Sequence, residues 1–176
     1  MPEWTHETFA AMFSREALRP FQPKPGSVGL TPMLEVHTAA AVVVFVLALD
    51  GFNDWEKRRE YLATLGVKCA LDYGEVTAVR FGSEAWTREF TPEEEAAKGN
   101  RLVETYNDKT EAIIVMGQLA DGYTLMVTAK LHPRDTGKIA YLGPWHMEQY
   151  ARLRSPLLEA FWDGYRQARA REHDDA

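Results

Sequence analysis

The stretch AAAVVVFVLAL at residues 39–49 decides the predicted fold, because it is the longest continuous apolar run in the chain. Valine and phenylalanine fill its centre at 42–46, and the whole run has 11 residues. A membrane-spanning helix needs about 20 apolar residues, whereas short valine-rich runs are typical of strands covered on both faces. The run Ala39–Leu49 therefore predicts a core strand that is buried on both faces.

The chain before this run predicts a helix and an irregular connector. Apolar residues recur at helical spacing from Thr5 to Arg19, and Pro20 ends the pattern. Residues 20–32 contain four prolines and two glycines, a composition typical of an extended connector. We therefore expect one helix over 5–19 and no regular structure over 20–32.

The chain after the run predicts a long helix and a second strand. Asn53 and Glu56 have the spacing of a capping box, and Gly74 is a natural helix end. Gly66 weakens this helix by about 1 kcal/mol relative to alanine, so a break is expected there. The expected inner face carries Trp55, Leu62, Leu65 and Cys69. Glu75–Gly82 alternates like a strand, and the order strand, helix, strand predicts a right-handed crossover between parallel neighbours.

A polar and acidic insertion is predicted over residues 87–110. Thr91, followed by Pro92 and two glutamates, has the pattern of a capped short helix. Insertions of this length in a compact domain are either functional lids or mobile loops. The sequence leaves both interpretations open.

An antiparallel meander is predicted next. Strand-like runs at 111–119 and 123–132 flank Asp121-Gly122, a dipeptide typical of tight hairpin turns. A further turn leads to a third strand at 138–142. With the earlier runs these strands predict a sheet of about five strands.

The elements together predict one α+β domain over residues 1–176. A final helix starts at Ser155, and the charged residues 169–176 are expected to fray. The chain shows no internal repeat and no domain boundary. We expect a mixed, mostly antiparallel sheet with the helices packed mainly on one face.

The segment VRFGSEAW at 79–86 resembles a family of small uncharacterised bacterial proteins. In that family a strand runs into Ser-Glu-Ala-Trp, and a polar stretch and a hairpin with an acidic turn follow. Ser83–Trp86, the polar stretch 87–110 and the hairpin at 111–132 are similar here. The resemblance spans roughly residues 39–145 and implies a shared fold and a bacterial source. It implies no activity, so no catalytic residue is transferred from it.

Charge and cysteine content narrow the class of protein. The formal net charge is −6, which favours solubility and disfavours binding to nucleic acid or to anionic membranes. Cys69 is the only cysteine, so the chain forms no internal disulfide, in keeping with a reducing compartment. Residues 1–19 lack the continuous apolar stretch of a signal peptide. We therefore expect a cytoplasmic protein.

No motif for a metal, a cofactor or a nucleophile is found. The five histidines lack the spacings of metal sites, and neither common phosphate-binding glycine motif is present. Cys69 is expected to be a core residue, and Ser83 lacks the second glycine of a nucleophile elbow. We expect no metal and no cofactor.

Two hypotheses about function remain, and the sequence favours the first. In the first hypothesis, the protein is a non-enzymatic binding or scaffolding module that associates with itself or with a protein partner. Arg80 and Trp86 are its candidate recognition residues, since arginine and tryptophan are enriched in interface hot spots. Trp86 is more readily interpreted as a core residue that seals the sheet.

The alternative is a small hydrolase with a pocket near the strand ends. Its polar groups would be Glu84, His132, Asp135 and His146, with residues 87–110 as a lid. This hypothesis requires at least two of these side chains to lie within hydrogen-bond reach of each other.

Overall fold

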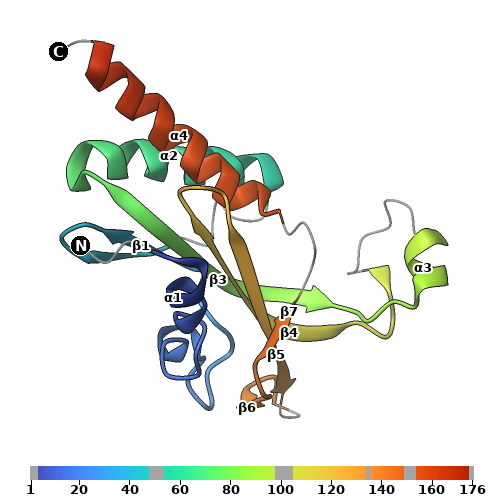
Figure 1. The fold of residues 1–176 in the computed structure, drawn as a ribbon. Helices are drawn as coiled ribbons and strands as arrows, with labels where there is room; N and C mark the ends of the chain where they lie inside the picture. Colours follow the sequence, from blue (N-terminus) through green and yellow to red (C-terminus); the bar gives the residue numbers. More distant parts are fainter. Residues whose placement is uncertain (1–3, 48–53, 98–104, 134–135, 149–153, 175–176) are drawn as a thin grey trace.

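The computed structural model describes residues 4–47, 54–97, 105–133, 136–148 and 154–174 (Figure 1). In these ranges it has four α-helices, one short 3-10 helix and a sheet of seven strands in which all neighbours are antiparallel. The elements are α1 (His6–Ala11), η1 (Arg19–Phe21), β1 (Met33–Thr38), β2 (Val42–Val46), α2 (Trp55–Tyr73), β3 (Val76–Thr87), α3 (Pro92–Ala97), β4 (Thr110–Leu119), β5 (Thr124–Pro133), β6 (Ile139–Leu142), β7 (His146–Glu148) and α4 (Pro156–Asp174). The predicted α+β class is confirmed.

Different parts of the chain cover the two faces of the sheet. The strand order is β2-β1-β3-β4-β5-β6, and β7 also pairs with β5. The two long helices, α2 and α4, lie together on one face (Figure 1). The segment around α1 covers the other face with the side chains of Phe9, Met12, Phe13, Leu18 and Phe21. Most of the helical mass is therefore on one side, as expected from the sequence.

β2 is an edge strand, so the prediction of a strand buried on both faces is wrong. Val42, Val44 and Val46 are 55%, 51% and 68% exposed. The inner position belongs to β1, which the sequence did not predict because Glu35 and His37 interrupt its apolar pattern. Glu35 is buried through its contact with Arg80, which is distant in sequence, and His37 is partly buried beside it. Residues 48–49, the end of the predicted strand, lie outside the described residues.

β2 and β3 run in the same direction but are not neighbours. Each pairs antiparallel with β1, which lies between them, so the predicted parallel pair is wrong. The chain turns from β1 into β2 through residues 39–41. The Thr38 hydroxyl accepts from the N–H groups of Ala40 and Ala41 and donates to the Ala41 carbonyl. Because the chain reverses direction in this tight turn, β1 and β2 pair as neighbours. The sequence did not predict β1.

The first helix is shorter than the predicted 5–19. Thr5 caps α1 in a capping box with Thr8, and the α-helix ends at Ala11. Beyond the helix, the Arg80 guanidinium donates to the carbonyls of Met12 and Ala17. The chain then folds through turns so that its aromatic side chains reach the sheet.

The long helix α2 is capped by Asp54, whose carboxylate accepts the N–H groups of Glu56 and Lys57. The predicted cap, Asn53, lies outside the described residues. Gly74 ends the helix with φ of 74°, as expected. Leu62, Leu65 and Cys69 are buried as predicted, whereas Trp55 is 47% exposed.

α2 continues through Gly66, so the expected break is absent. A Cβ at this position would overlap the Phe161 carbonyl, and one at Gly164 would overlap the Ala63 carbonyl. The two glycines therefore let α2 and α4 approach backbone to backbone. The apolar stripe of α4 is buried as predicted: Leu158, Phe161, Trp162, Tyr165 and Ala168.

The antiparallel meander over β4, β5 and β6 is confirmed, with Gly122 at φ of 91° in the turn. Thr91 and Glu94 form the predicted cap of α3. The short strand β7 was not predicted. The helix α4 runs into the charged end of the chain as far as Asp174. In the described part of the chain, no helix is both long and apolar enough to span a membrane.

Candidate functional site

The three described residues of the hydrolase hypothesis, Glu84, His132 and His146, do not come together. Glu84 lies in register with Ile113 and, through it, with Ala129. His132 is three positions further along β5, so it points to the opposite face of the sheet. His146 pairs with Thr128 and shares that face with His132, about 13 Å away along the strand. The fourth residue, Asp135, lies outside the described residues.

Glu84 and His132 each have another partner instead. The Glu84 carboxylate accepts the Leu30 N–H at 2.5 Å. Burial raises the pKa of Glu84 above its ordinary value, with the Leu30 N–H opposing and the charge of Glu111 adding to the rise. His132 stacks on Tyr141 with ring centroids 4.2 Å apart. Glu84, His132 and His146 therefore do not converge in the way that the hydrolase hypothesis requires.

Arg80 is part of a buried network and not of a recognition surface. Its guanidinium, on a side chain 5% exposed, donates to Glu35 Oε1 from Nε at 3.0 Å and from Nη2 at 2.6 Å. Nη1 donates to the Ala17 carbonyl at 3.0 Å and to that of Met12. The second partner of Glu35 is His37. Arg80 points away from Phe81, as predicted, and holds the N-terminal segment on the sheet.

Opposing effects set the pKa of the buried Glu35 carboxyl. Burial alone would raise it. The hydrogen bond from His37 and the charge and hydrogen bonds of Arg80 together outweigh burial, and the pKa lies below its ordinary value. Glu35 is therefore ionised at neutral pH, and its contacts with Arg80 connect the N-terminal segment to the sheet.

Trp86 is exposed, so the interpretation as a core residue is wrong. Its exposed fraction is 43%, and Lys109 Nζ lies 4.8 Å from the ring centroid. It lies near the end of β3, on the two-stranded extension that carries α3 away from the helix layer (Figure 1).

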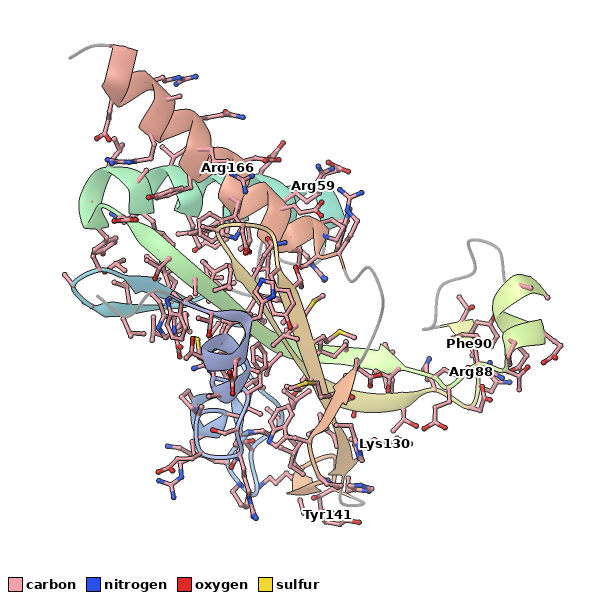
Figure 2. All side chains as sticks on the ribbon, viewed as in Figure 1. Arg59, Arg88, Phe90, Lys130, Tyr141 and Arg166 are labelled. Atoms are coloured by element: carbon pink, nitrogen blue, oxygen red, sulfur yellow. The ribbon has the colours of Figure 1, made fainter. Side chains whose placement is uncertain are left out.

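The extension is held by its own contacts. The Arg88 guanidinium lies 4.6 Å from the Phe90 centroid and 4.7 Å from that of Tyr106. It also pairs with Glu94 at 2.8 Å and with Asp108 at 2.7 Å. Figure 2 shows Arg88 and Phe90 at this end of the molecule, apart from Tyr141. The described part of 87–110 thus forms a projection, and an ion pair between Glu89 and Lys130 at 3.0 Å also connects it to β5.

Cys69 is a core residue, as predicted. It is fully buried, and burial raises the pKa of its thiol to about 11. A reactive cysteine needs the opposite shift, toward the thiolate. Within the described ranges, no three His, Cys, Asp or Glu side chains gather as a metal site.

The most distinctive surface feature is the open edge of β2. The Leu47 N–H donates to the Pro32 carbonyl at 2.8 Å, and the Thr38 N–H donates to the Ala41 carbonyl at 2.9 Å. Since backbone groups alternate along a strand, Val43 and Phe45 bond to β1. The N–H and C=O groups of Val42, Val44 and Val46 point to the open side, where no described strand pairs with them. The three exposed valines therefore also carry the open backbone groups.

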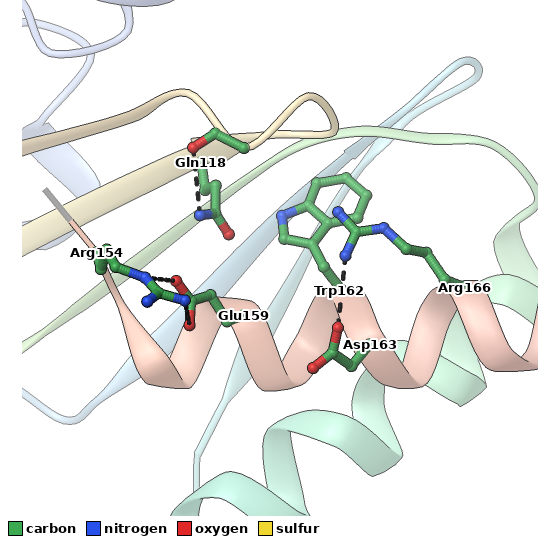
Figure 3. A pocket seen from close by; sticks show the side chains of 7 residues that line it. Gln118, Arg154, Glu159, Trp162, Asp163 and Arg166 are labelled. Carbon is green, nitrogen blue, oxygen red and sulfur yellow. Dashed lines mark hydrogen bonds and ion pairs between the residues drawn. The ribbon is translucent and has the colours of Figure 1, made fainter. Parts of the chain in front are cut away.

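A polar hollow is the second candidate site, and sequence reasoning missed it. It lies between the β4–β5 hairpin and α4 (Figure 3), and its lining includes Gln118, Trp162 and Arg166. One signal was present in the sequence: Gln118 is the only polar side chain between residues 112 and 119. An isolated amide within an apolar strand indicates a buried hydrogen-bonding role.

Comparisons of the chain with protein-family models, with curated proteins and with solved structures gave no match. The resemblance around Ser83–Trp86 therefore stays a prediction.

Proposed function

We propose that this protein is a non-enzymatic binding module that self-associates by pairing β2 with β2 of a second copy. The observation that carries the proposal is the open edge of β2, where three exposed valines present their backbone groups outward. Sheet edges of this kind are templates for strand addition.

The residues of β2 whose backbone groups point outward are the ones that a two-fold symmetric pairing needs. If Val44 faces Val44 of the second copy, Val42 faces Val46 and Val46 faces Val42. In an antiparallel ladder every one of these pairs exchanges two hydrogen bonds, so three pairs give six. The two seven-stranded sheets would then join as one.

The side chains favour a second copy as the occupant. Residues 39–47 contain no charge, proline or glycine, so this edge lacks the usual features that prevent strand pairing. Strand β2 pairs with β1 in unbroken register, without a bulge. Antiparallel self-pairing puts valine opposite valine at all three positions, and pairs of β-branched residues stabilise a sheet. The opposite edge strand, β6, has only four residues.

The test is the mass of the protein in solution, measured by light scattering after size-exclusion chromatography. We expect a dimer, and we expect Val44→Lys to weaken dimerisation about tenfold or more, because two ammonium groups would meet at the two-fold axis. Val28→Lys is the matched control, since Val28 is 84% exposed outside the strands. It should leave the dimer intact.

Two results of this mass measurement would contradict the proposal. One is a monomeric wild-type protein at concentrations of about 100 μM, where even a weak homodimer is populated. The other is a dimer that Val44→Lys and Val28→Lys leave equally stable, which would place the interface elsewhere. A third outcome, capture of a strand-forming peptide without dimerisation, would replace the second copy with a different partner and refute self-pairing.

The compartment is part of the same proposal. The single thiol, Cys69, is buried and has no disulfide partner, which supports a reducing environment such as the cytoplasm. The net charge of −6 supports a partner that is not nucleic acid.

A further inference from the structure

The exposed side chains of β2 form a row, Val42, Val44 and Val46, on the face of the sheet that the N-terminal segment covers. Their partners in the register with β1 are His37, Glu35 and Met33, and side chains directly opposite each other share a face. Glu35 is bonded to Arg80, whose guanidinium donates to two carbonyls of the N-terminal segment. This valine row therefore lies on the face opposite to α2 and α4.

The cover provided by the N-terminal segment ends between β1 and β2. On β1, Glu35 is 5% exposed, and the His37 ring lies against the Trp4 ring with centroids 5.9 Å apart. One strand further out, Val44 is 51% exposed although it is the direct neighbour of Glu35. The N-terminal segment thus forms a wall along β1, and the valine row lies outside this wall at the level of the sheet.

Pairing of β2 with β2 of a second copy leaves the valine row open. Strand pairing uses backbone groups at the edge, whereas the valine side chains point out of the plane of the sheet. In the proposed two-fold pairing Val44 faces Val44 of the second copy, so both valine rows lie on the same face. Six valines then form one apolar floor, with a wall of N-terminal segment along each side. This groove rests on the proposed dimer, because a single chain supplies half of the floor and one wall.

The dimensions of the groove match those of one α-helix. Three strand spacings, or about 14 Å, separate β1 of one copy from β1 of the other, and a helix with its side chains is about 10–12 Å across. Four residue steps, or about 14 Å, separate Val42 from Val46 along the strand. A helix of about nine residues covers this length.

The floor and the walls favour a helix over other apolar partners. Valine side chains carry no hydrogen-bonding group, so a peptide in extended conformation on this floor would bury its own backbone N–H and C=O groups without partners. A helix satisfies these groups internally. The flat face of another sheet would meet the two walls before it reached the valines.

We infer that the groove of the proposed dimer binds one amphipathic helix of a partner protein. The apolar face of this helix, with residues at i, i+3, i+4 and i+7, packs on the valine rows of both copies. Its polar face points to solvent between the two walls. Because the two-fold axis passes through the middle of the groove, each dimer binds one helix and not two.

The test measures binding of a dye-labelled peptide of about 14 residues by fluorescence anisotropy, and the mass of the complex by light scattering. Leucine occupies the apolar positions of the peptide, and alanine and glutamine occupy the others, so that charge does not drive binding. A scrambled peptide of the same composition is the control. We expect saturable binding at one peptide per two chains, and binding weaker by about tenfold or more for the scrambled peptide, which has no apolar face.

Val42→Thr with Val46→Thr separates the groove from the dimer. Threonine is β-branched like valine and leaves the backbone groups of β2 in place, so the dimer should remain. Four hydroxyl groups would then lie in the floor of the groove, and peptide binding should weaken by about tenfold or more. Val28→Thr, at a position 84% exposed outside the strands, is the matched control and should bind as the wild type does. If the double variant is monomeric, Val42→Thr alone serves the same purpose.

Four results with a dimeric protein would overturn the inference: no saturable binding, equal binding of the scrambled peptide, one peptide bound per chain, or unchanged binding by the dimeric threonine variant. Each of them leaves the proposed dimer standing. A monomeric wild-type protein would refute the proposed function, and this inference with it. The mass of the free protein therefore distinguishes failure of the dimer from failure of the groove.

Discussion

Replacing Arg80 with methionine should remove about 3–5 kcal/mol from the free energy of unfolding. The side chain is 5% exposed and makes two hydrogen bonds to Glu35 and one each to the carbonyls of Met12 and Ala17. Methionine fills a similar volume but supplies no donor. Glu35 would then be a buried carboxylate with His37 as its one remaining side-chain partner, and two carbonyls would lose their donor.

A double substitution measures how much of this loss comes from the interaction between Arg80 and Glu35. Replacing both members of a buried pair by apolar residues costs much less than removing one, because no charge is left buried alone. We therefore expect Arg80→Met with Glu35→Met to be more stable than Arg80→Met alone. The coupling free energy between the two sites should be in the range of about 1–3 kcal/mol.

The assay is urea unfolding followed by tryptophan fluorescence, with Val44→Lys as the background so that protein concentration does not enter the result. A loss below about 1 kcal/mol in Arg80→Met would refute the reasoning. So would a double variant whose loss equals the sum of the two single losses, because the pair would then not be coupled.

The same network predicts how stability depends on pH. The pKa of Glu35 is lower in the folded protein than its ordinary value of 4.5. Its contribution is therefore complete above that value and is lost as the pH falls through the lower, folded pKa. Arg80→Met should flatten this acid limb of the unfolding profile. An unchanged limb would show that other carboxylates cause it.

Three further predictions concern other positions. Glu84→Gln should modestly stabilise the protein at pH 7, because the pKa of Glu84 is raised and its charged form is disfavoured in the fold. The gain should vanish below about pH 4.5, where the glutamate of the wild type is as neutral as the glutamine of the variant. A constant gain across the pH range would contradict this. Gly66→Ala should lower the midpoint temperature of thermal unfolding, because overlap of the new Cβ with the Phe161 carbonyl outweighs a gain of about 1 kcal/mol in helix propensity. A raised midpoint would show that α2 and α4 can separate. Gln118→Leu should change the free energy of unfolding by less than about 1 kcal/mol in urea unfolding, because removal of the unpaired buried oxygen and loss of the hydrogen bond to Thr124 Oγ1 oppose each other. A loss above about 2 kcal/mol would contradict this.

Local patterns in the sequence were sufficient where neighbours along the chain determine structure. The hairpin at Asp121-Gly122, the end of α2 at Gly74 and the buried stripe of α4 depend on turn chemistry and helical spacing. These features were therefore predictable. The α+β class followed from the order of such elements.

The errors come from contacts that are distant in sequence. The apolar run at 42–46 has the composition of a central strand, but β1 takes that place since Arg80 and the N-terminal segment bury its Glu35. Position in a sheet depends on such partners, which periodicity does not reveal. The same holds for the hollow at Gln118, whose second wall comes from Trp162 on α4.

The docked N-terminal segment has a consequence for synthesis in the cell. Phe9, Phe13 and Phe21 rest on the sheet where Gly82 and Gly117 leave room for their rings. Ribosomes add about 5–20 residues per second, so the 98 residues from Phe21 to the end of β4 at Leu119 take roughly 5–20 s. During this time the nascent chain carries several large apolar side chains before their binding surface has been made. Chaperones that hold newly made chains would therefore meet this segment while its apolar side chains are still exposed.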